Sequence, residues 1–175
     1  MTTLVLTVIG DDRSGLVEAL AEVVARHDGN WDRSSMARLG NKFAGIVEVS
    51  VPSMRADALT ADLRPLEADG LLEITVEEAG AGPEHPGAPT DARWELRLVG
   101  QDRPGIVHEI SQALARNAVS IEELHTSTSS APMSAEPLFE VRAALVAVGD
   151  LDLDRLRAEL EALANELMVD IDLNV

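Results

Sequence analysis

The sequence contains no cysteine among its 175 residues. Disulfides, thiolate nucleophiles, iron–sulfur clusters and sulfur-ligated zinc sites are therefore excluded. Aromatic residues make up only 2% of the chain and comprise two Trp and two Phe, with no Tyr. The chain thus has almost no side chains on which bases or flat cofactors could stack, and we expect no cofactor.

Basic residues are also scarce, because 14 Lys and Arg stand against 31 Asp and Glu, a net charge of −17. Nucleic-acid affinity comes largely from cations that displace phosphate counterions, so direct binding to DNA or RNA is not expected. A hydrophobic content of 46% is ordinary for a globular protein. The chain has neither a basic and apolar leader nor a long apolar run. We therefore expect a soluble cytoplasmic protein that makes no membrane contact.

The chain repeats itself at an offset of 90 residues. Residues 8–17, VIGDDRSGLV, align without a gap with residues 98–107, LVGQDRPGIV. Between the copies, residues 80–92 are rich in Gly and Pro, as is typical of a linker. We predict one domain over residues 1–79, a linker over 80–92 and a second domain over 93–175.

Each copy shows the same order of predicted elements. Alternating apolar residues predict a first strand near residues 4–8 and near 94–98, and a helical spacing of apolar residues follows each strand. The same patterns predict strands over 30–39, 43–51, 120–128 and 138–148, helices over 55–68 and 152–167, and final strands near 72–76 and 169–175. Pro65 is expected to bend or shorten the helix over 55–68.

The order β-α-β-β-α-β is the ferredoxin-like split βαβ motif. The predicted fold class is therefore α+β, with two tandem ferredoxin-like βαββαβ domains, each an antiparallel sheet with both helices on one face. The leucine stripe over 153–167 is expected to be core rather than a coiled-coil seam.

A domain of this size buries too little surface to be comfortably stable alone. We therefore expect the two halves to pack on each other and the chain to form a homo-oligomer, most simply a dimer. Val5, Thr7 and Ile9 leave the second face of the first strand uncharged, and that face is a candidate interface.

A glycine-containing turn follows the first strand in each copy. Gly10 and Gly15 have the spacing of a phosphate-binding loop, but the Lys and hydroxyl residues that must follow are absent. The Rossmann glycine pattern fails as well. The turn still brings backbone N–H groups to a helix N-terminus, which suits a carboxylate. A plain strand-to-helix turn is the alternative.

Charged residues in these turns have two possible roles. Asp12 and Asp102 can accept hydrogen bonds from an ammonium group, or they can simply cap the helix. Arg13 and Arg103 can hold a ligand carboxylate, or they can form exposed ion pairs.

Nothing in the sequence has the spacing of a catalytic or metal site. The four histidines lack metal-ligand spacing, and no serine lies in a Gly-x-Ser-x-Gly context. We therefore expect neither enzyme activity nor a bound metal.

The duplicated unit, with Asp-Arg-x-Gly-hydrophobic-Val after each first strand, resembles the ACT domain family. The tandem arrangement, with a Gly/Pro linker and a longer second hairpin, most resembles the glycine cleavage system transcriptional repressor family. The resemblance spans the whole chain and implies sensing of a small ligand, commonly an amino acid, where the first-strand loop meets a neighbouring ACT unit. It also implies an accessory regulator that works through a partner protein. The ligand-binding residues implied by the resemblance are Asp11, Asp12, Arg13, Ser14, Gly15, Leu16, Asn30, Trp31, Gln101, Asp102, Arg103, Pro104, Gly105, Ile106, Ser120 and Ile121.

The two copies differ within this set, and the sequence leaves open which loop binds the ligand. The differing pairs are Asp11 and Gln101, Ser14 and Pro104, and Asn30 and Ser120. We expect an amino-acid-responsive regulatory protein that affects transcription through a protein partner. The alternatives are a structural or assembly module without a ligand, and a regulatory subunit of a separate metabolic enzyme.

Overall fold

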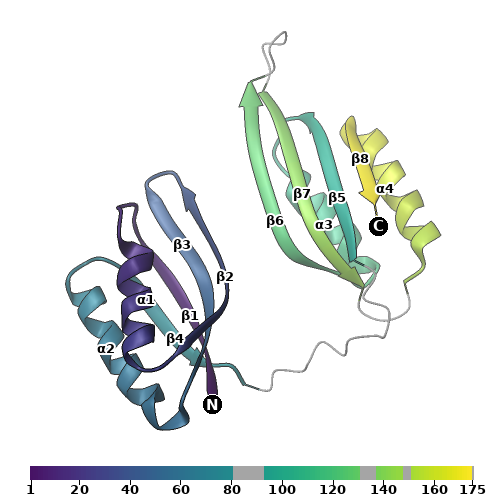
Figure 1. Ribbon diagram of the computed structural model, residues 1–175. Helices are drawn as coiled ribbons and strands as arrows, with labels where there is room; N and C mark the ends of the chain where they lie inside the picture. Colours follow the sequence, from purple (N-terminus) through teal and green to yellow (C-terminus); the bar gives the residue numbers. More distant parts are fainter. Residues whose placement is uncertain (81–92, 131–136, 148–150, 175) are drawn as a thin grey trace. The chain divides into compact units, whose positions relative to one another are not determined.

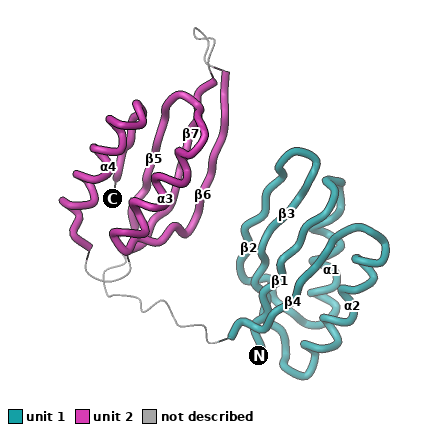
Figure 2. Tube along the Cα trace, turned by 180° about the vertical axis from the view of Figure 1, so that it is seen from behind, with its two compact units in different colours: residues 1–82 teal, residues 83–175 magenta. Residues whose placement is uncertain are grey.

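A computed structural model describes residues 1–80, 93–130, 137–147 and 151–174. It divides the chain into two compact units, Met1–Gly82 and Pro83–Val175 (Figure 2). Nearly all of the predicted linker over 80–92, and residues 131–136 of the longer second hairpin, lie outside the described residues. In the part of the chain that is described, no helix is long and apolar enough to cross a membrane.

Unit 1 has the order β-α-β-β-α-β. Its elements are β1 (Thr2–Asp11), α1 (Leu16–Arg26), β2 (Asn30–Leu39), β3 (Lys42–Val51), a short 3-10 helix (Ser53–Arg55), α2 (Ala56–Ala68) and β4 (Glu73–Glu78). The sheet is antiparallel with the strand order β2-β3-β1-β4. Both helices cover the same face of this sheet (Figure 1).

Unit 2 repeats this architecture. Its elements are β5 (Arg93–Gln101), α3 (Ile106–Arg116), β6 (Val119–Ser130), β7 (Pro137–Ala147), α4 (Leu153–Leu167) and β8 (Val169–Asn174). The strand order is β6-β7-β5-β8, again antiparallel. The predicted fold class, two tandem ferredoxin-like domains, is confirmed.

The core of each unit lies between the sheet and its two helices. In β1, Leu4, Leu6 and Val8 are buried under α1 and α2, so the residues between them point to the opposite face of the sheet. In unit 2, the leucine stripe of α4 is buried in the core, as predicted. Its buried members are Leu156, Leu160, Leu163 and Leu167.

Pro65 was expected to bend or shorten its helix, and the shortening is not observed. Helix α2 continues to Ala68, the predicted end, and the N–H of Asp69 donates to the carbonyl of Pro65 at 3.0 Å. Proline lacks an N–H donor of its own, but the donors of the last turn lie after Pro65. The helix therefore loses one internal hydrogen bond without ending there.

The two helices of each unit are joined by a polar contact at the same place. In unit 1, Nε2 of the buried His27 lies 3.0 Å from Oδ2 of Asp62. In unit 2, Nδ2 of Asn117 donates to Oε2 of Glu159 at 2.7 Å. His27 and Asn117 are 90 residues apart, so different side chains fill the same structural position in the repeat.

Candidate ligand-binding site

Each loop between the first strand and the first helix ends on a glycine in the left-handed region. Gly15 has φ 93° and Gly105 has φ 99°, and each occupies the N-cap position without a side-chain hydrogen bond to the helix. The capping role considered for Asp12 and Asp102 is therefore wrong, because the glycines hold that position. Oδ2 of Asp12 instead lies 3.4 Å from Nη1 of Arg38 in β2.

Arg13 ties the β1–α1 loop to the connection between α2 and β4. Its Nη2 donates to the carbonyl of Gly70 at 2.8 Å. This contact is neither of the two roles expected for Arg13, an exposed ion pair or a carboxylate clamp. It fixes the loop beside residues 69–72, the four residues that join α2 to β4.

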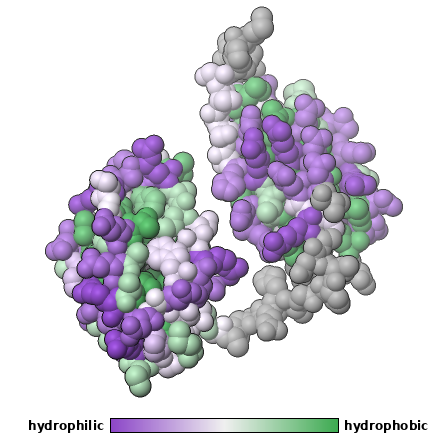
Figure 3. Space-filling model, viewed as in Figure 1, coloured by the Kyte–Doolittle hydropathy of each residue, from purple (hydrophilic) through white to green (hydrophobic). Residues whose placement is uncertain are grey.

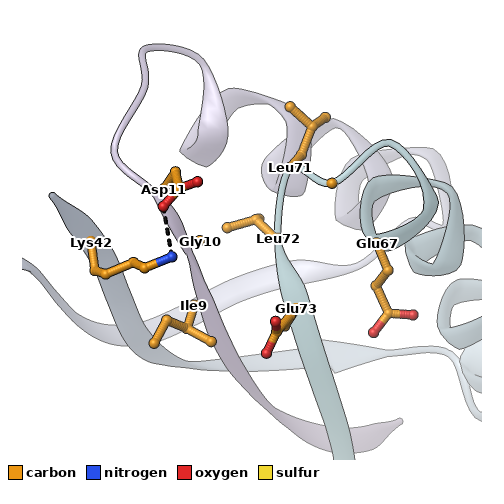
Figure 4. Close-up of a pocket in the computed structure, with 9 residues that line it drawn as sticks. Ile9, Gly10, Asp11, Lys42, Glu67, Leu71, Leu72 and Glu73 are labelled. Carbon is orange, nitrogen blue, oxygen red and sulfur yellow. Dashed lines mark hydrogen bonds and ion pairs between the residues drawn. The ribbon is translucent and has the colours of Figure 1, made fainter.

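A cavity of about 420 Å³ opens at this corner of unit 1. Strand β4 pairs with β1 only as far as Glu73, which lies opposite Ile9, whereas β1 continues through Gly10 and Asp11. A notch therefore remains between the end of β1 and the α2–β4 connection (Figure 4). We call this cavity the β1–β4 notch; its lining residues are Ile9, Gly10, Asp11, Lys42, Glu67, Gly70, Leu71, Leu72 and Glu73.

The charges around the β1–β4 notch are arranged on two sides. On one side, Nζ of Lys42 donates to Oδ1 of Asp11 at 2.6 Å, and this hydrogen bond, together with the charge of Lys42, lowers the pKa of Asp11. On the other side stand the carboxylates of Glu67 and Glu73 (Figure 4). Oε1 of Glu67 also accepts from the N–H of Ile74 at 3.2 Å, which holds the Glu67 side chain in place.

This arrangement suits a small zwitterion. An ammonium group can approach the carboxylates of Glu67 and Glu73, and a carboxylate group can approach Lys42. Ile9 and Leu71 supply apolar surface for the side chain of the ligand.

A second hollow lies on the other side of the same loop. Its volume is about 230 Å³, and its lining includes Asp12, Gly15, Leu16 and Phe43. The β1–α1 loop is therefore flanked by two recesses, and its backbone is accessible from both.

The implied residues of the second strand do not join the loop of their own unit. Asn30 lies opposite Ser50, which in turn lies opposite Thr3, whereas the loop begins after Asp11. Thr3 and Asp11 are separated by roughly 27 Å at the usual rise of a strand. The same holds for Ser120 and Ile121 in unit 2, which lie opposite Val146 and Leu145 at the far end of β7 from Gly100. Their participation in a shared site stays a prediction, and it requires a second ACT unit.

Unit 2 does not build the same notch. Only Met168 separates α4 from β8, so Val169 lies directly opposite Gly100, where an added Cβ would collide with its side chain. The position of Asp11 is taken by Gln101, and the position of Lys42 is taken by Leu138. The remaining implied residues of this loop, Asp102 to Ile106, thus border a filled corner without the ion pair.

Sequence reasoning identified Asp11 but missed most of the notch. Lys42, Glu67 and Glu73 come from the hairpin, α2 and β4, which no loop motif connects. One signal was available in the sequence: the second helix and the last strand are farther apart in the first copy than in the second. Among the residues that the structure describes, no cluster of three or more His, Asp and Glu side chains is placed to hold a metal ion.

Comparisons with known sequences point to a single family. Residues 2–77 and residues 94–165 each match a sequence family described as ACT domain. The chain is also 23% identical over 172 residues to the glycine cleavage system transcriptional repressor of Escherichia coli (strain K12), covering 98% of this chain and 89% of the relative. The repressor of Shigella flexneri matches with the same identity and coverage.

Solved structures share the tandem arrangement. A protein of unknown function from Galdieria sulphuraria superposes with a TM-score of 0.86 at 29% identity, covering 99% of this chain and 97% of that one. A proposed glycine cleavage system transcriptional repressor superposes with a TM-score of 0.66 at 21% identity, covering 99% and 96%. The second likeness, at this low identity, concerns the fold alone.

Proposed function

We propose that this chain, which belongs to the ACT domain family and carries one such domain in each unit, is a regulatory protein. In this proposal it responds to an amino acid that binds in the β1–β4 notch of unit 1. ACT domains are small-ligand regulatory modules, and the match to glycine cleavage system repressors supports a regulatory role for the chain. The amino-acid ligand and its place in the notch are the new elements of this proposal.

One observation carries the choice of ligand. The β1–β4 notch places the ammonium of Lys42 on one side and the carboxylates of Glu67 and Glu73 on the other, across an apolar floor (Figure 4). A free amino acid presents the opposite charges at its two α-groups. The ion pair between Asp11 and Lys42 holds the lysine in place before the ligand arrives, which lowers the ordering cost of binding.

The corner of unit 2 favours, for that unit alone, the alternative of a module without a ligand. Its connection between helix and strand is the single residue Met168, and Leu138 replaces the lysine. We propose that unit 2 serves assembly or partner contact, while unit 1 binds the ligand.

The effect on transcription is proposed to pass through a partner protein. The relatives are named as transcriptional repressors, but a net charge of −17 opposes contact with a phosphate backbone. A protein partner removes this conflict, and no catalytic step is needed.

A thermal-shift screen tests the ligand site. Each of the twenty amino acids is added to the purified chain, because a ligand that binds only the folded state raises the melting temperature. Glu73→Gln and Lys42→Met remove one charge from each side of the notch. Asp170→Asn is the matched control, since Asp170 lies opposite Val99 as Glu73 lies opposite Ile9.

We expect at least one amino acid to stabilise the wild type and the Asp170→Asn variant. The same amino acid should lose most of its effect on the Glu73→Gln and Lys42→Met variants. The proposal fails if no amino acid shifts the wild type, or if the two notch variants respond as the control does.

A further inference from the structure

The open face of the unit 1 sheet, on the side away from the helices, has an uncharged centre. Across its middle row, strand by strand, stand Ser35, Ile46, Thr7 and Thr75, which pair in register. The neighbouring row adds Ala37, Ala44 and Ile9, with the charged Glu73 at its β4 edge. Ile46 is 55% exposed and Ile9 is 42% exposed, so two large apolar side chains meet solvent in one patch.

The same row in unit 2 is charged. The residues in the matching register positions are His125, Arg142, Arg97 and Asp172. The strands of unit 2 lie in front of their helices in Figure 1, and hydrophilic residues dominate that unit in the matching space-filling view (Figure 3). The fold therefore does not impose an uncharged face, and its presence in unit 1 alone indicates that this face is covered.

We infer that the open face of unit 1 packs against the same face of a second copy of this chain. The open face of unit 2 is a poor partner, because its charged residues Arg97, Arg142 and Asp172 would lose water against the uncharged Thr7 and Ile46, at a high desolvation cost. When two identical faces pair, their uncharged centres lie against each other. The four strands form a face roughly 19 by 30 Å, or roughly 600 Å², close to the ~800 Å² per partner of a stable interface.

The charges at the rim select one orientation. A two-fold axis parallel to the strands places β2 of one copy over β4 of the other, and sheets commonly pack with their strands nearly aligned. Arg33 shares a row with Glu48, Val5 and Glu77. In this orientation Arg33 therefore faces Glu77 of the second copy, and Asp11 faces Lys42 of the second copy. An axis across the strands would instead bring the two acidic β4 edges together.

This orientation also covers the β1–β4 notch. Leu39 pairs with Lys42, which pairs with Asp11, so the three residues form one row across β2, β3 and β1. Strand β4 does not extend to this row. The two-fold axis places Leu39 of the second copy over that vacant position, at the mouth of the notch. Leu39 is 84% exposed in the single chain, and the dimer gives this leucine a place to be buried.

Ligand binding and dimer formation should therefore strengthen each other by the same factor. This coupling rests on the proposed function, whereas the dimer itself does not. A ligand enclosed by Leu39 of the second copy is lost more slowly than one in an open notch.

Sedimentation velocity of the full chain tests the dimer. Ile46→Glu places a charge at the centre of the face, and Arg142→Glu is the matched control in unit 2. We expect the wild type and the control to be dimers and Ile46→Glu to be a folded monomer, as judged by circular dichroism. Thr7→Lys provides a second disruption at the same centre, should Ile46→Glu fold poorly.

A charge exchange tests the orientation. Glu77→Arg should weaken the dimer about tenfold, because two attractive contacts per dimer become repulsive while the ion pair of Arg33 with Glu48 of its own copy is kept. Arg33→Glu should weaken it at least as much, because it also opposes Glu48. The double variant should form a stronger dimer than either single one, because the contact across the interface is attractive again. A monomeric wild type, a dimer that survives Ile46→Glu and Thr7→Lys, or a double variant weaker than both single ones would overturn the inference.

The two proposals fail separately. A dimer without any response to amino acids retains the interface and rejects the ligand, whereas a monomer that is stabilised by an amino acid does the reverse. If both proposals hold, Leu39→Ser should reduce the thermal shift that the amino acid causes in the dimer. This substitution leaves the charges that line the notch unchanged.

Discussion

Gly10, near the end of β1, and Gly15, at the end of the β1–α1 loop, are five residues apart and serve different purposes. Gly15 adopts φ 93° at the N-cap of α1, and an added Cβ there would meet no atom within 4 Å. Gly10 has ordinary strand geometry, but an added Cβ would collide with the carbonyl oxygen of Leu71. One glycine is needed for its backbone conformation and the other for the close approach of the α2–β4 connection.

These two roles predict different losses of stability when each glycine is replaced by alanine. Gly15→Ala should lower the free energy of unfolding of unit 1 by about 1 kcal/mol, because only the left-handed φ is strained. Gly10→Ala should cost more, about 1–3 kcal/mol, because the connection must move. The chain has one tryptophan in each unit, so urea unfolding followed by Trp31 fluorescence in a Trp94→Phe background reports on unit 1. Equal costs for the two substitutions would contradict this explanation.

The helix pairs show how one element contact is maintained by different side chains. In unit 2, Glu159 accepts a hydrogen bond from Asn117, and Nε of Arg116 also donates to its carboxylate, at 2.9 Å. The hydrogen bond from Asn117, followed by that from Arg116, lowers the pKa of Glu159 below its ordinary value of 4.5. Together these contacts join α3 to α4.

This lowered pKa makes the stability of unit 2 depend on pH. A carboxyl group whose pKa is lower in the folded than in the unfolded state stabilises the fold above the unfolded value, and the effect is lost as the pH falls below it. Unit 2 should therefore lose stability as the pH drops through 4.5. Glu159→Gln should weaken that dependence, whereas Glu161→Gln on the same helix should leave it unchanged. Trp94 fluorescence during urea unfolding at several pH values measures this difference, and identical pH profiles for the wild type and Glu159→Gln would refute it.

The strands and helices could be predicted from the sequence because both copies repeat one apolar pattern. Alternation placed strands near residues 4–8 and 94–98, where β1 and β5 lie, and helical spacing placed α4 up to Leu167. The repeat without a gap also supports each predicted strand or helix twice, since an accidental pattern rarely recurs at the same offset.

The notch could not be predicted in the same way. Its shape depends on where β4 stops pairing with β1, at Ile9 and Glu73. These two residues are far apart in the sequence, and the periodicity within each segment does not say where their pairing ends. Lys42 and Glu73 are separated by 31 positions in the sequence, and each is ordinary in its own segment. Asp11 was identified only because it lies within the repeated loop.

At the scale of the whole molecule, the two units share one fold but present different surfaces. Unit 1 has an open corner with an ion pair and an uncharged sheet face, and unit 2 has a filled corner and a charged face. A longer α2–β4 connection and a few substitutions at matching register positions account for both differences. We therefore propose a division of roles, in which unit 1 binds the ligand and a second copy and unit 2 is available to other partners.

Hydrogen–deuterium exchange with and without the amino acid that gives the largest thermal shift tests the ligand site most directly. The account predicts slower exchange in two segments of unit 1, the end of β1 through Gly10 and Asp11 and the α2–β4 connection at residues 69–72. The corresponding segments of unit 2, around Gly100 and Val169, should exchange at an unchanged rate. Protection confined to the unit 2 loop, or no protection at the β1–β4 notch, would contradict the assignment of the ligand to unit 1.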